Sequence, residues 1–220
     1  MNVTEALTAR HSVRAYRPQP VPEKTIMEIM EAALKAPSWA NTQPWEIYVA
    51  AGDALERVRA AYVGNFEQEA PRCSDIPRPE AWPPAILKRM EELREQRLKQ
   101  LEQHGQGPAR EDINRLNREF FRAPAVIYLC MDRTLSSWSI FDLGMLAQSI
   151  MLAATERGLG TIPAYNLAVY SDILHAELDI PDDLAIVIGI AVGFEDGSHP
   201  QNRFRSERRP AAEVVHLRNV

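Results

Sequence analysis

The 220-residue chain has few of the residues that build disulfide frameworks or metal clusters. Its two cysteines, Cys73 and Cys130, are far apart, and its five histidines are scattered without the paired spacing of metal ligands. Two distant cysteines form neither a disulfide framework nor a metal cluster and are typical of a reducing compartment. We therefore expect a cytoplasmic protein without a structural metal.

Long apolar runs are also missing. The first ten residues, MNVTEALTAR, contain no apolar signal core, and no apolar run is as long as a membrane span. We therefore expect no membrane partner. The net charge of −5 and the isoelectric point near 5.6 argue against nucleic acid as a partner.

Motifs of nucleophilic enzymes and of dinucleotide-binding folds are absent from the sequence as well. There is no Ser-His-Asp pattern and no reactive-cysteine motif, and the glycines of GLG at 158–160 lack the GxGxxG spacing. We therefore assign no catalytic residue, and a nicotinamide has no dedicated dinucleotide fold to bind.

What the sequence does contain is an uneven alternation of helices and strands. Helical spacing predicts helices at 2–10, 21–38, 53–64, 85–104, 110–123, 136–158 and 170–178. Apolar alternation or continuous apolar runs predict strands at 44–50, 124–131, 159–165 and 184–193, with the tail 214–219 as one more. This order favours a single α+β domain over 1–220, an α/β sandwich built on a small mixed sheet flanked by helices. The helix at 136–158 is apolar nearly all round from Ile140 to Ala154, which requires cover on most faces, either by the protein's own core or by a partner subunit. Because this stretch is too apolar for a monomer surface, we expect a homodimer.

The connection at 65–121 is too long for a simple loop. It contains five prolines between 65 and 84 and a highly charged helix at 85–104, whose thin apolar stripe is Ile86, Met90, Leu93 and Leu101. Connections of this length are usually functional, so we expect a mobile helical lid, with a solvated decoration as the alternative. The candidate aromatic walls of a substrate pocket are Trp39, Trp82 and Phe120 or Phe121. The candidate partners for a substrate carboxylate are Arg72, Arg78 and Arg122.

Positive charge gathers at the start of the chain, in ARHSVRAYRPQP at 9–20. If the segment from Ser12 is extended, Ser12 and Arg14 point to one side and Val13 to the other. An anion on that side would meet a hydroxyl and a guanidinium, with Arg10 close by. Taken alone, the stretch is better explained by a solvated, partly helical turn.

Two further stretches make anion binding the better explanation of these arginines. In KAPSWANTQPW at 35–45, prolines hold a loop with Asn41 and Gln43, whose amides donate and accept as the edge of a heteroaromatic ring requires. In QNRFRSERRP at 201–210, four arginines follow a buried strand. Separately, these are an ordinary loop with an aromatic anchor and a basic tail.

Together, in their order and spacing, the three stretches resemble the FMN-dependent nitroreductase family over almost the whole chain. The stretches REDINRLNREFFRAP and DLGMLAQSIMLAATERGLGT further resemble a bacterial subgroup that acts on nitroaromatic acids such as nitrobenzoate. The chain departs from the family at Trp39, where the residue is usually small. It departs again at Tyr165 and Asn166, where familiar members carry an acidic residue and a glycine.

The resemblance implies FMN as the cofactor and NAD(P)H and a small aromatic acceptor as partners, in a ping-pong cycle. It implies that the phosphate, ribityl chain and pyrimidine edge of FMN are held by Arg10, His11, Ser12 and Arg14, with Arg205 and Arg208 as further phosphate ligands. The loop with Pro37, Ser38, Asn41 and Gln43 is implied to approach the flavin from the second subunit. The flavin N5 side is implied to lie against Pro163, Ala164, Tyr165 and Asn166. Because proline has no N–H, a backbone donor to N5 would come from one of the last three.

Other functions share parts of this pattern. A reductive dehalogenase of iodotyrosine type, or a quinone or flavin reductase, would use the same cofactor loops with a different lid. A non-enzymatic FMN carrier would bind the flavin without oxidising a nicotinamide. A nucleic-acid binder built on the arginines fits least, because the net charge is negative and no helix face is basic.

Overall fold

The structure is a computed structural model that describes residues 1–103 and 110–218. Within these residues, four strands form one sheet in the order β1-β2-β4-β3. The strands are β1 Glu46–Ala51, β2 Ala125–Asp132, β3 Gly160–Ala164 and β4 Leu184–Gly193. Their three pairings are antiparallel. The α+β class is confirmed, while the parallel part of the predicted mixed sheet is reduced, in the described residues, to one bridge between Ser12 and Thr161.

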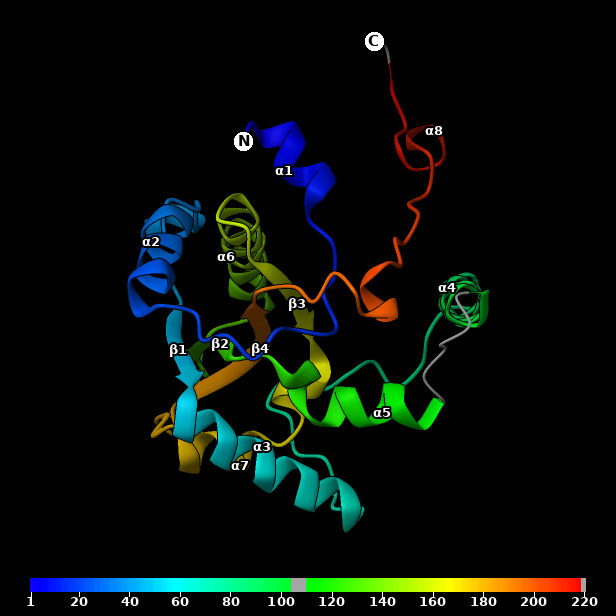
Figure 1. The fold of residues 1–220 in the computed structure, drawn as a ribbon. Coiled ribbons are helices and arrows are strands. Elements are labelled where there is room, and N and C mark those ends of the chain that lie inside the picture. The colour runs from blue at the N-terminus through cyan, green and yellow to red at the C-terminus, as the bar shows by residue number, and fades with distance from the viewer. Residues whose placement is uncertain (104–109, 219–220) are drawn as a thin grey trace.

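Helices cover both faces of the sheet and make three layers (Figure 1). The helices of the described residues are α1 Val3–Ala9, α2 Glu23–Ala33, α3 Gly52–Glu67, α4 Pro84–Gln103, α5 Arg110–Arg118, α6 Ser137–Glu156, α7 Ser171–Glu177 and α8 Ala211–Val214. The faces are covered by α2, α3, α6 and α7. The side chains of β2 alternate between the faces. Ile127 and Leu129 pack with the buried residues of α2 and α6, and Val126 and Tyr128 pack with those of α3 and α7. Both faces of β2 are therefore buried, which explains its continuous apolar run.

Helix α6 is covered on one side and open on the other. Leu143, Leu146 and Ile150 are buried against the sheet and α2, whereas Trp138 and Phe141 are 62% and 66% exposed. By length and composition alone α6 could cross a membrane, but the core helix of a soluble protein passes the same test. The homodimer predicted from this helix stays a prediction, and the exposed rings of α6 are where its contact would lie.

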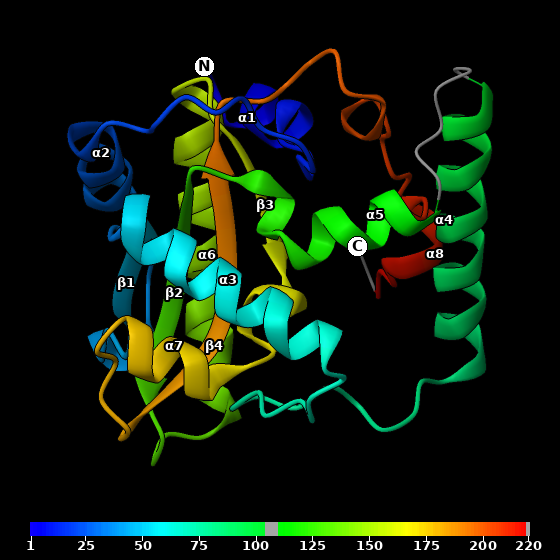
Figure 2. The ribbon, with the colours of Figure 1, turned by 60° about the horizontal axis from the view of Figure 1, so that its bottom comes forward.

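The predicted lid at 65–121 belongs to the connection between β1 and β2. Helix α3 extends to Glu67, the segment 68–83 has no helix or strand, and α4 lies apart from the sheet at the edge of the molecule (Figures 1 and 2). Among the described residues of α4, Leu101 alone is buried. This agrees with the expectation that the charged helix packs weakly. The predicted end of this helix at His104 lies outside the described residues.

The C-terminal tail differs from the prediction. The strand expected at 214–219 is not formed in the described residues: α8 begins after Pro210 and ends at Val214, and 215–218 have no regular structure. The last predicted residue, Asn219, lies outside the described part of the chain. A strand needs a neighbouring edge to receive its backbone hydrogen bonds, and the tail runs away from the sheet (Figure 1).

Candidate functional site

The arginine-rich segment near the N-terminus is extended and attached to the sheet. Val13 is fully buried and donates its N–H to the carbonyl of Thr161 at 3.0 Å, beside the Ser12–Thr161 bridge. With Val13 in the core, Ser12 and Arg14 line a cavity on the other side. The alternation expected from the sequence is therefore present in the structure.

Gly160 makes this attachment possible. A Cβ atom built there would lie 2.4 Å from Cγ2 of Val13 and 2.9 Å from its Cβ, closer than Cβ contacts found in proteins. Glycine is needed here because the Val13 side chain packs directly against the backbone of β3. This is a function of the GLG stretch that the sequence analysis did not recognise.

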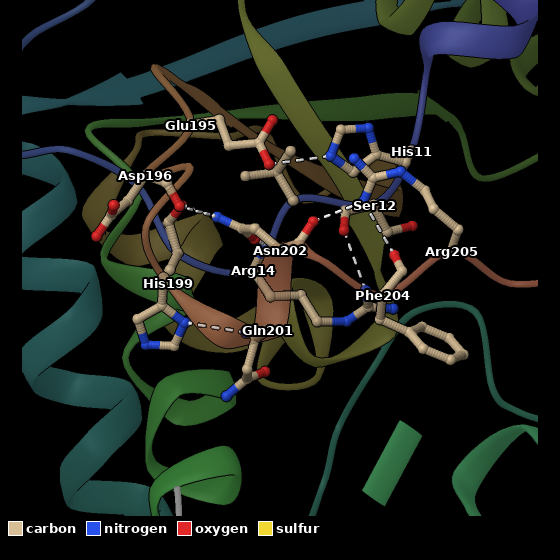
Figure 3. A network of polar contacts seen from close by, with 12 residues as sticks. His11, Ser12, Arg14, Glu195, Asp196, His199, Gln201, Asn202, Phe204 and Arg205 are labelled. Carbon is tan, nitrogen blue, oxygen red and sulfur yellow. Dashed lines mark hydrogen bonds and ion pairs between the residues drawn. The ribbon is translucent and has the colours of Figure 1, made fainter. Parts of the chain in front are cut away.

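Asn202 joins the N-terminal segment to the segment that follows β4 (Figure 3). Its side chain is 2% exposed and its Oδ1 accepts the N–H of Arg14 at 2.7 Å. Its Nδ2 donates to the carbonyls of Ala15 and Asp196 at 2.7 and 2.9 Å. Nearby, the His11 Nε2 contacts Glu195 Oε1 at 3.1 Å. No sequence motif singled out Asn202, although Pro200 just before the basic stretch marks a turn at this place.

The two basic segments line one cavity of about 1060 Å³. Of the predicted cofactor ligands, the structure brings six together there: Arg10, His11, Ser12, Arg14, Arg205 and Arg208. Three more arginines, Arg89, Arg94 and Arg97, enter from α4, and Glu207 is the single acidic residue among the described residues of the lining. The described lining thus holds seven arginines and one carboxylate, and this makes it strongly electropositive.

Burial raises the electrostatic cost of this arrangement. Desolvation lowers the pKa of Arg10, and the charge of Arg208 lowers it further. Desolvation also lowers the pKa of Arg14, partly offset by Tyr16. Partly desolvated guanidinium groups favour a bound anion, because charge-assisted hydrogen bonds would replace the lost hydration.

The loop after α2 is a separate and strained element. Three of its non-glycine residues have left-handed backbones: Ala40, Asn41 and Gln43, with φ of 48°, 58° and 46°. The loop is held by Ser38, whose Oγ accepts the Gln43 N–H at 2.9 Å, and by the buried Asp142 of α6, which accepts the Trp39 N–H at 3.2 Å. Each such backbone costs about 1–3 kcal/mol and tends to mark a functional position.

This loop does not line the arginine cavity. Pro37, Asn41 and Gln43 are exposed and Ser38 is half-buried, and the neighbouring hollow is instead lined by Trp39, Trp138 and other residues of the loop and α6. Within one chain, the structure therefore keeps the loop's predicted cofactor ligands apart from the arginine cluster.

The predicted N5 segment lies at the end of β3. Pro163 and Ala164 pair with Ile190 and Gly189, and the chain then turns through Tyr165 and Asn166. The lid loop contacts this turn: Ser74 Oγ hydrogen-bonds the Tyr165 hydroxyl at 2.9 Å, and the Arg78 guanidinium lies 5.1 Å from the centre of the Tyr165 ring. The insertion between β1 and β2 is thus attached to the segment expected to face the flavin.

Two of the predicted aromatic walls belong to the core instead. Phe120 and Phe121 are 0% and 1% exposed, and Phe120 stacks edge-on against Tyr62 at 4.7 Å between ring centres. The helix predicted to run to residue 123 ends at Arg118, and left-handed backbones at 120–122 turn both rings inward. Trp39 and Trp82 remain exposed and stay candidates.

Among the described residues, no group of three His, Cys, Asp or Glu side chains could hold a metal ion. Cys73 is exposed and Cys130 is buried, and neither forms a disulfide in the described part of the chain. The property that this site offers a ligand is therefore positive charge, which suits an anion.

Comparison with known proteins gives consistent matches over nearly the whole chain. The model of the nitroreductase family matches residues 7–194. A chloronitrobenzene nitroreductase of Comamonas testosteroni is 34% identical over 216 residues, covering 94% of this chain and 92% of the relative. A 4-nitrobenzoate reductase of Pseudomonas putida is 30% identical over 219 residues, covering 96% and 93%. The crystal structure of the FMN-dependent nitroreductase NfnB from Mycobacterium smegmatis in complex with NADPH superposes with a TM-score of 0.89 at 29% identity, covering 99% of this chain and all of that one.

Proposed function

Because this chain belongs to the nitroreductase family, we propose that it is an FMN-dependent oxidoreductase that uses NAD(P)H to reduce nitroaromatic compounds. The observation that carries the proposal is the cavity in which Arg10, Ser12 and Arg14 meet Arg205 and Arg208. These segments are almost two hundred residues apart in the sequence. An anionic cofactor bound between them would explain why both are rich in arginine and line the same cavity.

The residues present suit FMN. Its phosphate is a dianion, and arginine is the residue best suited to bind phosphate oxygens in pairs. The cavity is as large as the upper range of small-molecule sites. Within the described residues, Nε of Arg97 and Nε2 of Gln201 are buried without a hydrogen-bond partner, as expected beside a missing acceptor. When bound, FMN supplies the hydride and electron chemistry, and the protein supplies binding and orientation.

We assign the remaining predicted ligands to the partner subunit and to the N5 side. The strained loop with Pro37, Ser38, Asn41 and Gln43 would complete the site across a homodimer, next to the exposed face of α6. At the end of β3, Pro163 leaves the backbone N–H groups of Ala164, Tyr165 and Asn166 as the candidate donors.

The chain offers the nicotinamide no dinucleotide fold, so we propose that NAD(P)H and the acceptor use the same space in turn. This ping-pong order predicts parallel lines in double-reciprocal plots at several acceptor concentrations, and intersecting lines would contradict it. Quinones are proposed as further acceptors. We propose a cytoplasmic protein of one domain over 1–220, with 65–121 as its lid.

The cofactor site is tested with Arg14→Ala and the matched control Arg17→Ala, an exposed arginine three residues on. A charge-assisted hydrogen bond contributes about 1.5–3 kcal/mol, so Arg14→Ala should weaken FMN binding roughly tenfold or more. Arg17→Ala should leave it within about twofold. Flavin fluorescence titration measures both, and equal affinities in the two variants would mean that the cavity does not hold the flavin. Bleaching of the bound flavin by NADPH or NADH would exclude the carrier alternative.

The position of Arg78 favours nitroaromatic acids among the acceptors. Arg78 lies over Tyr165, at the segment proposed to face N5, whereas Arg122 is paired with Glu119 at 2.6 Å. We expect Arg78→Ala to raise the KM for 4-nitrobenzoate about tenfold and to leave that for nitrobenzene nearly unchanged, because only the first substrate has a carboxylate. Arg72→Ala, an exposed arginine on the same loop, is the control. Equal effects on both substrates would assign Arg78 to lid packing.

A further inference from the structure

The irregular segment 68–83 is held to the core over one short stretch. Cys73 donates its N–H to the carbonyl of Val169 at 3.1 Å, and the Ser171 hydroxyl donates to the carbonyl of Cys73 at 2.5 Å. The next residue, Ser74, hydrogen-bonds the Tyr165 hydroxyl at 2.9 Å. These contacts fix the backbone of the segment well before α4 begins.

Asp75 completes this attachment with a buried carboxylate, whose side chain is 8% exposed. One of its oxygens accepts from the Ile186 N–H at 2.8 Å, with His175 Nε2 at 3.2 Å, and the other accepts from Arg133 at 2.9 Å. Burial alone would raise the pKa of Asp75, but these three groups outweigh it and lower that pKa. Asp75 is therefore charged at neutral pH and ties the segment to β4, α7 and the end of β2.

Three residues beyond Asp75 lies an arginine between two prolines, Pro77-Arg78-Pro79. A proline fixes its own φ and confines the residue before it to extended conformations. Both effects act on this stretch, so the backbone is stiff on each side of Arg78. The attachment at Asp75 therefore determines where Arg78 lies.

The guanidinium of Arg78 is held by an aromatic ring. It lies 5.1 Å from the centre of the Tyr165 ring, within the range of a cation–π interaction. The ring is itself fixed, because Tyr165 packs against the core and its hydroxyl bonds Ser74. Within residues 1–103 and 110–218, Arg78 forms no ion pair, so its charge is available to an anion.

We propose that Asp75 and Tyr165 determine specificity through Arg78: they hold its guanidinium beside the turn at the end of β3, where it binds the carboxylate of a nitroaromatic acid. The inference rests on the proposed function. Asp75 fixes the base of the arm Pro77-Arg78-Pro79, and Tyr165 fixes its charged end. Both are positioning residues, because the contact to the carboxylate is made by Arg78. The arm selects acids over neutral nitroaromatic compounds of the same shape.

Benzoate and benzamide separate recognition of the charge from stacking of the ring, because they have nearly the same shape and only benzoate is an anion. Their dissociation constants for the oxidised, FMN-loaded protein are measured from the change in flavin absorbance, without turnover. We expect the wild type to bind benzoate about tenfold more tightly than benzamide. In Arg78→Ala and Asp75→Ala this preference should fall to within about twofold, and an Asp75→Ala variant with the full wild-type preference overturns the proposal.

The direction of the change distinguishes positioning from a direct electrostatic effect. Asp75→Ala removes a negative charge, which by Coulomb attraction and repulsion alone would tighten benzoate binding, whereas loss of positioning weakens it. Asp182→Ala removes an exposed carboxylate from the loop before β4 and is the matched control, with a preference within about twofold of wild type. Asp75→Asn keeps an oxygen for the Ile186 N–H and should retain part of the preference.

A double-mutant cycle tests whether both residues act through Arg78. In the Arg78→Ala background, neither Asp75→Ala nor Tyr165→Leu should lower the preference further, and a further loss there overturns the proposal. Tyr165→Leu provides this test in a protein with Asp75 intact. Tyr165→Phe keeps the ring under the guanidinium and should keep most of the preference.

The same measurements separate this inference from the proposed function. A wild-type protein that binds FMN and reduces nitrobenzene, but binds benzoate and benzamide equally, overturns this inference alone. A bound flavin that neither NADPH nor NADH bleaches overturns the proposed function.

Discussion

At the scale of single residues, the site depends on a few polar side chains that have no ligand role themselves. Asn202 makes three hydrogen bonds that join the segment after β4 to the backbone at Arg14 and Ala15. His199 begins the short turn Pro200–Asn202, because its ring Nδ1 accepts the Gln201 N–H at 3.3 Å. An accepting nitrogen has no proton, so this turn needs His199 in its neutral form.

The first prediction follows from the pKa of His199. Burial lowers it, Arg122 lowers it further, and Asp196 opposes them. A histidine with a lowered folded pKa stabilises the protein above its unfolded pKa of about 6.5 and loses that contribution as pH falls below it. Loss of one hydrogen bond lowers the free energy of unfolding by about 1 kcal/mol. Between pH 7.5 and 5, the Tm of the wild type should therefore fall about 2–4 °C more than the Tm of a His199→Asn variant.

Asparagine is the informative replacement because its side-chain oxygen accepts the same N–H without titrating. Differential scanning fluorimetry of the apoprotein measures the Tm, with His216→Asn in the exposed tail as the matched control. An identical pH profile for wild type and His199→Asn would show that protonation of His199 does not affect the turn.

At the scale of elements, the site is a junction between β3, the N-terminal segment and the segment after β4. Val13 and Ser12 join β3 at Thr161, and Tyr16 forms a bridge to Glu195 beyond β4. The sheet therefore sets the direction in which Ser12 and Arg14 point. The irregular segment 68–83 is held separately: Asp75 accepts from the Ile186 N–H at 2.8 Å and from Arg133 at 2.9 Å.

Gly160→Ala tests the junction. The new Cβ would meet Val13 at 2.4 Å, so the N-terminal segment must move away from β3. Overpacking of this kind typically costs about 1–3 kcal/mol, and we expect both a lower Tm and weaker FMN binding. Gly64→Ala in α3 is the control, since its Cβ would meet nothing within 4 Å. Full FMN affinity in Gly160→Ala would mean that the Val13–Thr161 attachment does not position the ligands.

At the scale of the whole molecule, the proposed site is divided between two separate places on one chain. The arginine cavity lies on one part of the surface, and the strained loop lies near the exposed aromatic rings of α6. Trp39, Trp138 and Phe141 are each more than 60% exposed, and monomeric proteins rarely leave such aromatic groups in water. A second copy that covers this face would bring its own loop to the flavin.

Phe141→Arg tests this arrangement because it places a charge in the middle of the proposed interface. We expect light scattering to give a dimer for the wild type and for the conservative Phe141→Tyr, and mostly monomer for Phe141→Arg. Obligate interfaces bury over about 2,000 Å², so the wild-type dimer should persist at micromolar concentration. FMN affinity should fall together with dimerisation, and a monomeric wild type with bound FMN would contradict the two-chain site.

The sequence by itself determined the α+β class, the strands β1 to β4 and the alternation of Ser12, Val13 and Arg14, because local periodicity follows from the geometry of strands and helices. It also identified the two basic segments that meet in the cavity, because their motifs occur in the same order and at the same spacing along the chain as in the nitroreductase family. Tertiary structure decided what depends on contacts between distant segments. It placed Phe120 and Phe121 in the core, where their left-handed backbones turn the rings inward. It also brought Val13 so close to Gly160 that a side chain at position 160 would clash. It also brought Arg97 and Asn202 to the site from elements whose packing no local pattern encodes.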